Sequence, residues 1–240
     1  MHKVIFYIYS LFIIPCNQNV FSQNYFNEKI KYHYQVQYKD STIFTSEKMI
    51  LQPLGRRWIF QPWKQDAFKY IYFPDTAQLR KYIDPEQFYR ERDKKYLVKK
   101  GKARVKLFEI TGGVDSDYEF FLHPPRTNQY RMLTTSIYPS INKLALDENI
   151  SKKYGSYLQT YGSTGKLYDM NYITKPIKNF IYKNEDLGTC WEIYGESIVD
   201  GILNTSFVSC YSLKYGFIYI NYQIQNKVEI NFQLTEVEKL

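Results

Sequence analysis

The chain has 240 residues and carries 32 Lys and Arg against 24 Asp and Glu, a formal net charge of +8. It contains 25 Tyr and 16 Phe but only three His and three Cys, with no HExxH, CxxC or paired-His motif, which argues against the common zinc sites. The length suits one sizeable domain or two small ones. The positive charge is typical of proteins that meet anionic surfaces, and it equally serves solubility.

Residues 1–22 have the pattern of a secretory signal peptide. Lys3 gives a short basic start, and residues 4–14 (VIFYIYSLFII) form an apolar run that is too short to span a bilayer. Val20 and Ser22 then occupy the −3 and −1 positions of a cleavage site before Gln23, where signal peptidase accepts such residues. The sequence therefore predicts export to the periplasm, the outer membrane surface or the extracellular space.

No apolar run after the leader approaches the roughly 20 residues that a membrane helix needs, so no transmembrane helix is expected there. Cys16 offers an alternative to free secretion, because a cysteine at the end of a leader can be acylated and anchor the chain in a membrane. Pro15 does not fit the acylation motif, and free secretion is favoured over lipid anchoring.

The mature chain has the composition of a β protein. Tyr, Phe, Ile, Val and Thr recur in alternating runs, while Ala is scarce and long runs of period 3.6 are missing. We predict an all-β, mainly antiparallel fold: a curved sheet, open barrel or sandwich of about 10–14 strands with at most one or two short helices. Residues 23–240 form a single domain in this prediction, with 136–157 as a connector, including one short helix, between halves at 23–135 and 158–240.

Trp63 is the first candidate ligand-binding residue. It follows a proline in a segment that also contains Trp58 and Phe60. Aromatic rings stack on sugars, and they also fill the cores of β proteins. The core role is favoured for this segment, with Trp63 as the ring expected at the surface.

A basic hairpin around Gly101 is the second candidate. Lys99, Lys102 and Arg104 belong to a run of basic side chains at 94–106, which is suited to binding polyanions such as acidic glycans or lipopolysaccharide. Lysines also protect exposed strand edges from aggregation, and that role is favoured. No specific nucleic-acid partner is expected.

The string His123-Pro124-Pro125-Arg126 is the most distinctive in the chain. Neither proline can donate a hydrogen bond to a sheet, so the strand before the string must end abruptly. The string is either a rigid rim that presents His123 and Arg126 to a ligand, or a stiff corner in which Arg126 pairs with a carboxylate. The corner is favoured.

The segment Val199-Asp200-Gly201 is predicted as a three-residue hairpin loop, with Gly201 at the position that needs a positive φ. A hairpin centred on Asp200 places Cys190 opposite Cys210. An even number of cysteines in an oxidising compartment then favours a disulfide between them. Two buried free thiols are the alternative.

A second hairpin, centred on Asn226, follows directly, so four consecutive antiparallel strands are expected. The predicted pairs are Ile224 with Val228, Tyr222 with Ile230, Ile220 with Phe232 and Ile218 with Leu234. One face of this hairpin is uniformly apolar, and a slip of one residue would destroy the match, so the register is well specified. Gly112-Gly113, by contrast, is predicted as a tight turn followed by solvated carboxylates.

Three strings together resemble a known pattern: His123-Pro124-Pro125-Arg126, Trp191-x-Ile193-x-Gly195 and Lys214-Tyr215-Gly216-Phe217. They are similar to strings in a family of secreted, β-rich envelope proteins of Bacteroidota-type bacteria, over roughly residues 115–235. The resemblance implies a location in the cell envelope and a β architecture. The family has no assigned activity, so the resemblance implies no catalytic residues.

A sheet of many amphipathic strands must close, stack or be covered, and a partly covered sheet leaves an apolar groove. We therefore expect a secreted or envelope binding protein that holds an apolar or amphipathic ligand such as a lipid, or a partner protein, on a concave sheet. The alternatives are a glycan-binding or glycan-processing protein and a surface adhesion or assembly module. Binding is favoured over catalysis because no nucleophile, metal or paired-carboxylate motif stands out, and no metal or cofactor is expected.

Overall fold

The computed structural model describes residues 27–41, 44–58, 65–73, 106–116, 118–135, 139–143, 151–160, 165–199 and 201–240. The predicted signal peptide, Cys16 and most of the basic hairpin lie outside these residues. No helix within the described ranges is long and apolar enough to cross a membrane.

Fourteen strands are present in the described part of the chain, and twelve of them form one antiparallel sheet in the order β6-β5-β4-β3-β2-β1-β14-β13-β12-β11-β8-β7. A 3-10 helix, η2, spans Asn128–Thr135. The strands are β1 (Ile30–Lys39), β2 (Phe44–Arg57), β3 (Asp66–Phe73), β4 (Phe108–Asp115), β5 (Glu119–Leu122), β6 (Ser140–Asn142), β7 (Ser151–Thr160), β8 (Gly165–Ile177), β9 (Ile181–Tyr182), β10 (Glu185–Asp186), β11 (Cys190–Val199), β12 (Ile202–Ser212), β13 (Gly216–Ile224) and β14 (Val228–Lys239). Strands β9 and β10 pair only with each other.

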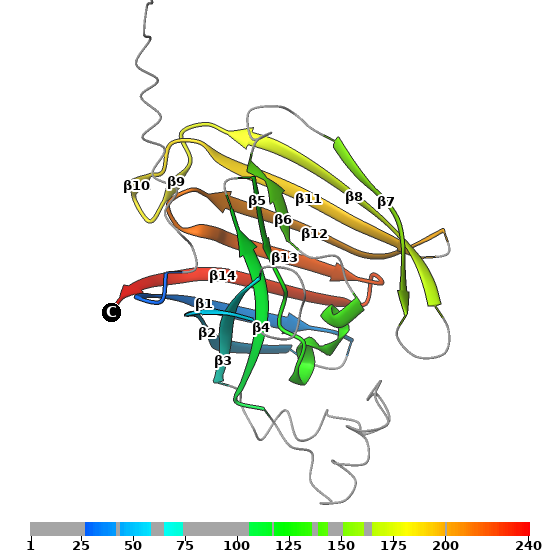
Figure 1. Ribbon diagram of the computed structural model, residues 1–240, viewed down its shortest axis with the longest axis horizontal. Coiled ribbons are helices and arrows are strands. Elements are labelled where there is room, and N and C mark those ends of the chain that lie inside the picture. The colour runs from blue at the N-terminus through cyan, green and yellow to red at the C-terminus, as the bar shows by residue number, and fades with distance from the viewer. Residues whose placement is uncertain are drawn as a thin grey trace, which may run out of the picture.

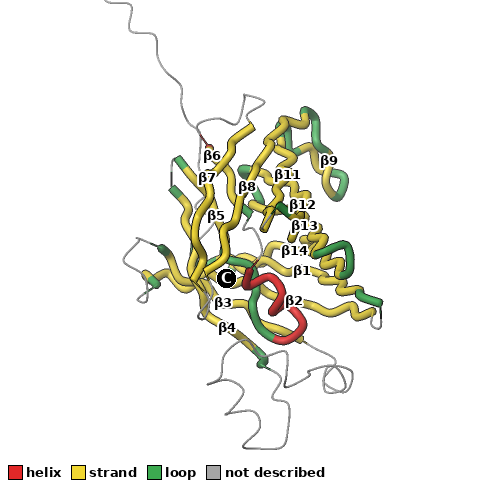
Figure 2. Tube along the Cα trace, turned by 90° about the vertical axis from the view of Figure 1, so that its right-hand side faces the viewer, coloured by secondary structure: helices red, strands yellow, loops and turns green. Residues whose placement is uncertain are grey.

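The large sheet is strongly curved and nearly closed into a barrel, which confirms the predicted all-β, antiparallel class. In Figure 1, β4, β5 and β6, which form one edge of the sheet, cross in front of β12, β13 and β14, so this edge folds over the strands farther along the sheet. Figure 2 shows the same curve from its end, with η2 drawn in red across the near opening. The concave face is therefore enclosed by the sheet itself.

Alternation of side chains along each strand decides which face is buried. In β1, Tyr32, Tyr34 and Val36 are at most 5% exposed, while His33 and Gln35 between them are less buried. Successive side chains of a strand point to opposite faces, so the aromatic and aliphatic set of β1 fills the concave side. Most of the tyrosines whose burial the structure describes are thus interior residues.

One phenylalanine packs β5, next to one edge of the sheet, against β12 and β13 on the opposite side of the interior. Phe120 of β5 is fully buried, and its ring lies 5.2 Å from that of Tyr211 in β12 and 5.3 Å from that of Phe217 in β13. These strands are not hydrogen-bonded neighbours of β5. Aromatic packing, rather than backbone pairing, therefore joins the two sides of the curve.

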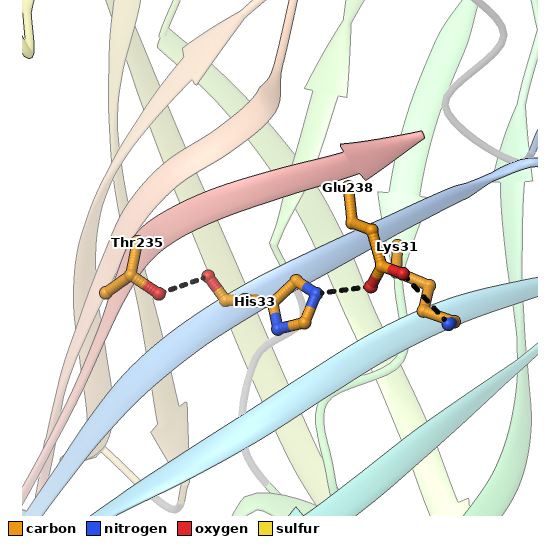
Figure 3. A network of polar contacts seen from close by, with 4 residues as sticks. All are labelled: Lys31, His33, Thr235 and Glu238. Carbon is orange, nitrogen blue, oxygen red and sulfur yellow. Dashed lines mark hydrogen bonds and ion pairs between the residues drawn. The ribbon is translucent and has the colours of Figure 1, made fainter. Parts of the chain in front are cut away.

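The N-terminal and C-terminal parts of the sheet meet where β1 pairs with β14 (Figure 3). The register shifts after His33, and the hydroxyl of Thr235 donates a hydrogen bond of 3.0 Å to the His33 carbonyl at that bulge. On the same side, Glu238 lies 2.9 Å from the His33 imidazole and 3.4 Å from the Lys31 ammonium. These contacts fix the register where the backbone ladder is interrupted.

The C-terminal hairpin has the predicted register. Ile224 pairs with Val228, Tyr222 with Ile230, and Ile220 with Phe232, and β11 to β14 are four consecutive antiparallel neighbours. The apolar face predicted from this pairing is buried on the concave side of the sheet. Gly201 has the expected positive φ, at 78°.

The predicted pairing of Cys190 with Cys210 is wrong. Cys210 pairs with Glu192, because Val199 pairs directly with Ile202 and a bulge follows at Ser197. Both cysteines are fully buried free thiols, and they are hydrogen-bonded to each other as diagonal neighbours on one face. A diagonal pair is farther apart than a directly opposed one, so the shifted register leaves the thiols in contact without a bond between them.

We expect neither thiol to react with an alkylating reagent in the native protein, because both side chains are shielded from solvent. In denaturant without a reductant, peptide mapping should find both Cys190 and Cys210 alkylated. Labelling that appears only after reduction would contradict the free-thiol state and establish the disulfide instead.

Two other predictions are corrected. Gly112-Gly113 is not a turn: both residues lie inside β4 and pair with Ala67 and Asp66 of β3. The segment 136–157 is not simply a connector, since it contains β6 and the first part of β7. The short helix predicted within 136–157 falls mainly on residues 144–150, which lie outside the described residues.

Candidate binding site on the concave face

A small apolar cavity lies between the concave face of the sheet and the segment that follows β5. Its volume is about 20 Å³, which is room for a single water molecule. The floor comes from β1, β2, β3, β13 and β14, and the roof comes from the end of β5 and three prolines. The lining residues are Tyr34, Met49, Leu51, Tyr70, Leu122, Pro124, Pro125, Pro139, Ile220, Tyr222 and Phe232.

We call residues 123–135, which run over this cavity and end in η2, the strap. Pro124 and Pro125 are buried against the floor, and the segment 123–127 belongs to no strand. Prolines lack the N–H that a sheet ladder requires, so the strap cannot be held by regular strand pairing at this point. It is fastened instead by individual hydrogen bonds to β3, β4 and β2.

The first fastening is at the start of the strap. The Tyr70 hydroxyl donates to the His123 carbonyl at 2.9 Å, and the His123 N–H donates to the Gly112 carbonyl at 3.3 Å. Three residues on, the Arg126 N–H donates to Glu109 Oε1 at 2.9 Å. These bonds hold the two prolines against the floor of the cavity.

The Arg126 side chain lies against the sheet rather than in solvent. Its guanidinium donates a 2.6 Å hydrogen bond to the Thr111 hydroxyl. Burial raises the pKa of the neighbouring Glu109 carboxyl, and the positive charge of Arg126 opposes that shift. The backbone N–H of Arg126 bonds to the carboxylate while its guanidinium bonds to Thr111, so the ion pair expected of the corner interpretation stays a prediction.

The second fastening is at η2. The Asn128 side chain accepts a hydrogen bond from the Lys106 N–H at 3.0 Å and donates one to the Lys106 carbonyl at 2.8 Å. Two residues later, the Tyr130 hydroxyl donates a hydrogen bond to Glu47 Oε1 of β2. Tyr130 is fully buried and Glu47 is 6% exposed.

Burial shapes the electrostatics of this contact. It raises the pKa of Glu47, and the hydrogen bond from Tyr130 only partly offsets that effect. Burial likewise raises the pKa of Tyr130 well above its ordinary value, so its phenol stays protonated and remains the donor. The Tyr130 ring stacks on Tyr72 at 5.8 Å and lies 6.0 Å from Phe232 in the cavity floor.

The structure places His123 in an aromatic pocket. Its ring lies 5.6 Å from Trp58 and 5.4 Å from Phe121, edge-on to both, and the residue is 6% exposed. Burial, with a smaller contribution from the charge of Arg126, lowers the pKa of His123 to about 3. His123 is therefore an uncharged interior group at neutral pH.

The other predicted ligand-binding residues, Trp63, Lys99, Lys102 and Arg104, lie outside the described residues. Sequence reasoning missed Glu47, although a signal for it exists. Glu47 shares the inward side of β2 with Thr45 and Met49, and a carboxylate at an inward position of an alternating strand is unusual.

Comparison of the sequence with protein-family models and with curated proteins finds no significant match. The resemblance to secreted envelope proteins therefore stays a prediction. No group of three or more His, Cys, Asp or Glu side chains within the described ranges is arranged to hold a metal ion.

Proposed function

We propose that the protein is a non-enzymatic binding protein of the cell envelope that holds an apolar or amphipathic ligand on the concave face of its sheet. The supporting observation is the apolar cavity under the strap, because it is a gap between a rigid sheet and a segment without strand pairing. A ligand larger than one water molecule enters by displacing the strap. The floor that it then meets is aromatic and aliphatic, as ligand pockets commonly are.

The strap is held to the sheet differently from the strands of the cavity floor. A few side-chain and backbone hydrogen bonds fasten it, whereas the floor belongs to a continuous ladder of paired strands. Elements with few shared backbone hydrogen bonds open at lower free energy than core strands. The export predicted from residues 1–22 is consistent with an envelope role and remains part of the proposal.

Binding is tested with dodecan-1-ol, a neutral amphiphile, added to the full chain purified without detergent. We expect native mass spectra to show one bound alcohol and calorimetry to show saturable binding. A protein that binds no dodecanol, and that carries no co-purified apolar ligand from its own host, would contradict the proposal.

A matched pair of substitutions locates the site. Ile220→Ser makes the cavity floor polar, whereas Ile202→Ser makes the same change at a residue that is 72% exposed. We expect the first variant to weaken dodecanol binding at least about fivefold and the second to leave it unchanged. Circular dichroism establishes that both variants remain folded. Equal binding by both would place the ligand elsewhere.

A further inference from the structure

The Tyr130 hydroxyl donates a hydrogen bond to the buried Glu47 carboxylate, and Tyr130 lies on the strap, the segment that a ligand displaces in the proposed function. Glu47 belongs to β2 and thus to the fixed sheet, while Tyr130 belongs to the strap. If the strap is displaced, Glu47 loses the donor that Tyr130 supplies. A buried carboxylate without a donor is costly, so any ligand that opens the strap is favoured if it replaces that donor.

Glu47 lies next to the apolar cavity on the same face of the sheet. It is two residues from Met49, a lining residue, which is a separation of about 7 Å along a strand. Thr45, two residues further along β2, is 8% exposed, and its hydroxyl has no hydrogen-bond partner among the described residues. Next to the apolar floor, β2 therefore presents the Glu47 carboxylate and a Thr45 hydroxyl that is available for a hydrogen bond.

The strap occupies both parts of this site at once. Pro124 and Pro125 cover the apolar floor, and the Tyr130 hydroxyl meets the carboxylate. We propose that the strap mimics the ligand, and that the ligand is an amphiphile with an apolar body and a hydrogen-bond-donating head, a primary amine or an alcohol, which binds Glu47 in place of Tyr130. This inference rests on the proposed function and specifies its ligand class.

The proposal separates this ligand class from fatty acids and other anionic lipids. A carboxylate head placed beside Glu47 would put two like charges in a buried site, where repulsion is poorly screened. An ammonium head gains a charge-assisted hydrogen bond at the same place. The whole chain carries a formal charge of +8, so nonspecific attraction favours the anionic amphiphile, opposite to the selectivity expected of the site.

Calorimetry with three amphiphiles of one chain length tests the head-group preference, with the amine and the carboxylate below their micelle concentrations and the alcohol below its solubility limit. We expect the full chain to bind dodecylamine at least about tenfold more tightly than dodecanoate, with dodecan-1-ol between them. Glu47→Gln keeps the size of the side chain and an acceptor for Tyr130 but removes the negative charge. In that variant the preference for the amine over the carboxylate should fall below about threefold.

Glu229→Gln is the matched control, since Glu229 lies on β14 and its carboxylate pairs with Lys39 on the exposed outer side. This variant should keep the preference of the wild type. Dodecanoate binding that equals or exceeds amine binding would overturn the head-group inference while leaving the proposed function in place. Amine preference that survives in Glu47→Gln would overturn the role of Glu47. If none of the three amphiphiles binds, the proposed function itself fails.

Discussion

Phe120→Ala should cost about 3–5 kcal/mol of unfolding free energy, the range for removing a buried aromatic ring from a packed core. Phe120 is fully buried and contacts the rings of Tyr211 and Phe217 across the interior. Loss of the ring leaves a cavity where β5 packs on β12 and β13, and no backbone pairing between these strands compensates. Urea unfolding followed by circular dichroism measures the change, with a constant slope showing that both proteins unfold to similar states.

Phe44→Ala is the matched control for this measurement. Phe44 begins β2 and is 60% exposed, so its truncation should change the unfolding free energy by no more than about 0.5 kcal/mol. A Phe120→Ala protein as stable as this control would mean that β5 does not pack across the interior, and that the curve of the sheet is open.

The two C-terminal hairpins show which features of the fold can be predicted from sequence. At Asn226 the apolar alternation and the turn agree on a single register, and that register is present. At Gly201 the hairpin and the positive φ were predicted correctly, but Val199 belongs to the strand rather than to a three-residue loop, and the pairing of Cys190 with Cys210 was wrong. Moving each pairing partner by two residues leaves every side chain on its predicted face, so hydrophobic alternation cannot distinguish the two registers. A bulge near the turn then decides between them.

The candidate site was less predictable than the strands. The His-Pro-Pro-Arg string identified a break in the sheet, since the two prolines exclude strand pairing. Its position over the concave face depends on the curvature of twelve strands, a property of the whole sheet. The contact of Tyr130 with Glu47 joins residues that are 83 positions apart, and only the folded chain brings them together. Local sequence patterns therefore indicated the strap but not what it covers.

Burial of His123 should make the protein lose stability in mild acid. The pKa of His123 is lowered to about 3 in the folded state, against an ordinary value of 6.5. Between these values the unfolded chain binds a proton that the folded chain does not, so stability falls as the pH falls from 6.5 toward 3. At pH 4.5 the loss due to this residue is about 2–3 kcal/mol.

His123→Asn isolates this contribution, because asparagine does not titrate. We expect the loss of unfolding free energy between pH 7.5 and pH 4.5 to be about 2–3 kcal/mol smaller in the variant than in the wild type, by urea unfolding at both pH values. Glu47 and Glu109 act in the opposite direction, because burial raises the pKa of each carboxyl and their contribution to stability grows as the pH falls. Both carboxyl groups are present in the variant and in the wild type, so their contribution cancels in the comparison. Equal losses in variant and wild type would contradict the burial of His123, as would an imidazole NMR signal that titrates near pH 6.5. A smaller loss in the variant would instead establish that the strap begins with a buried histidine that is neutral in the folded protein.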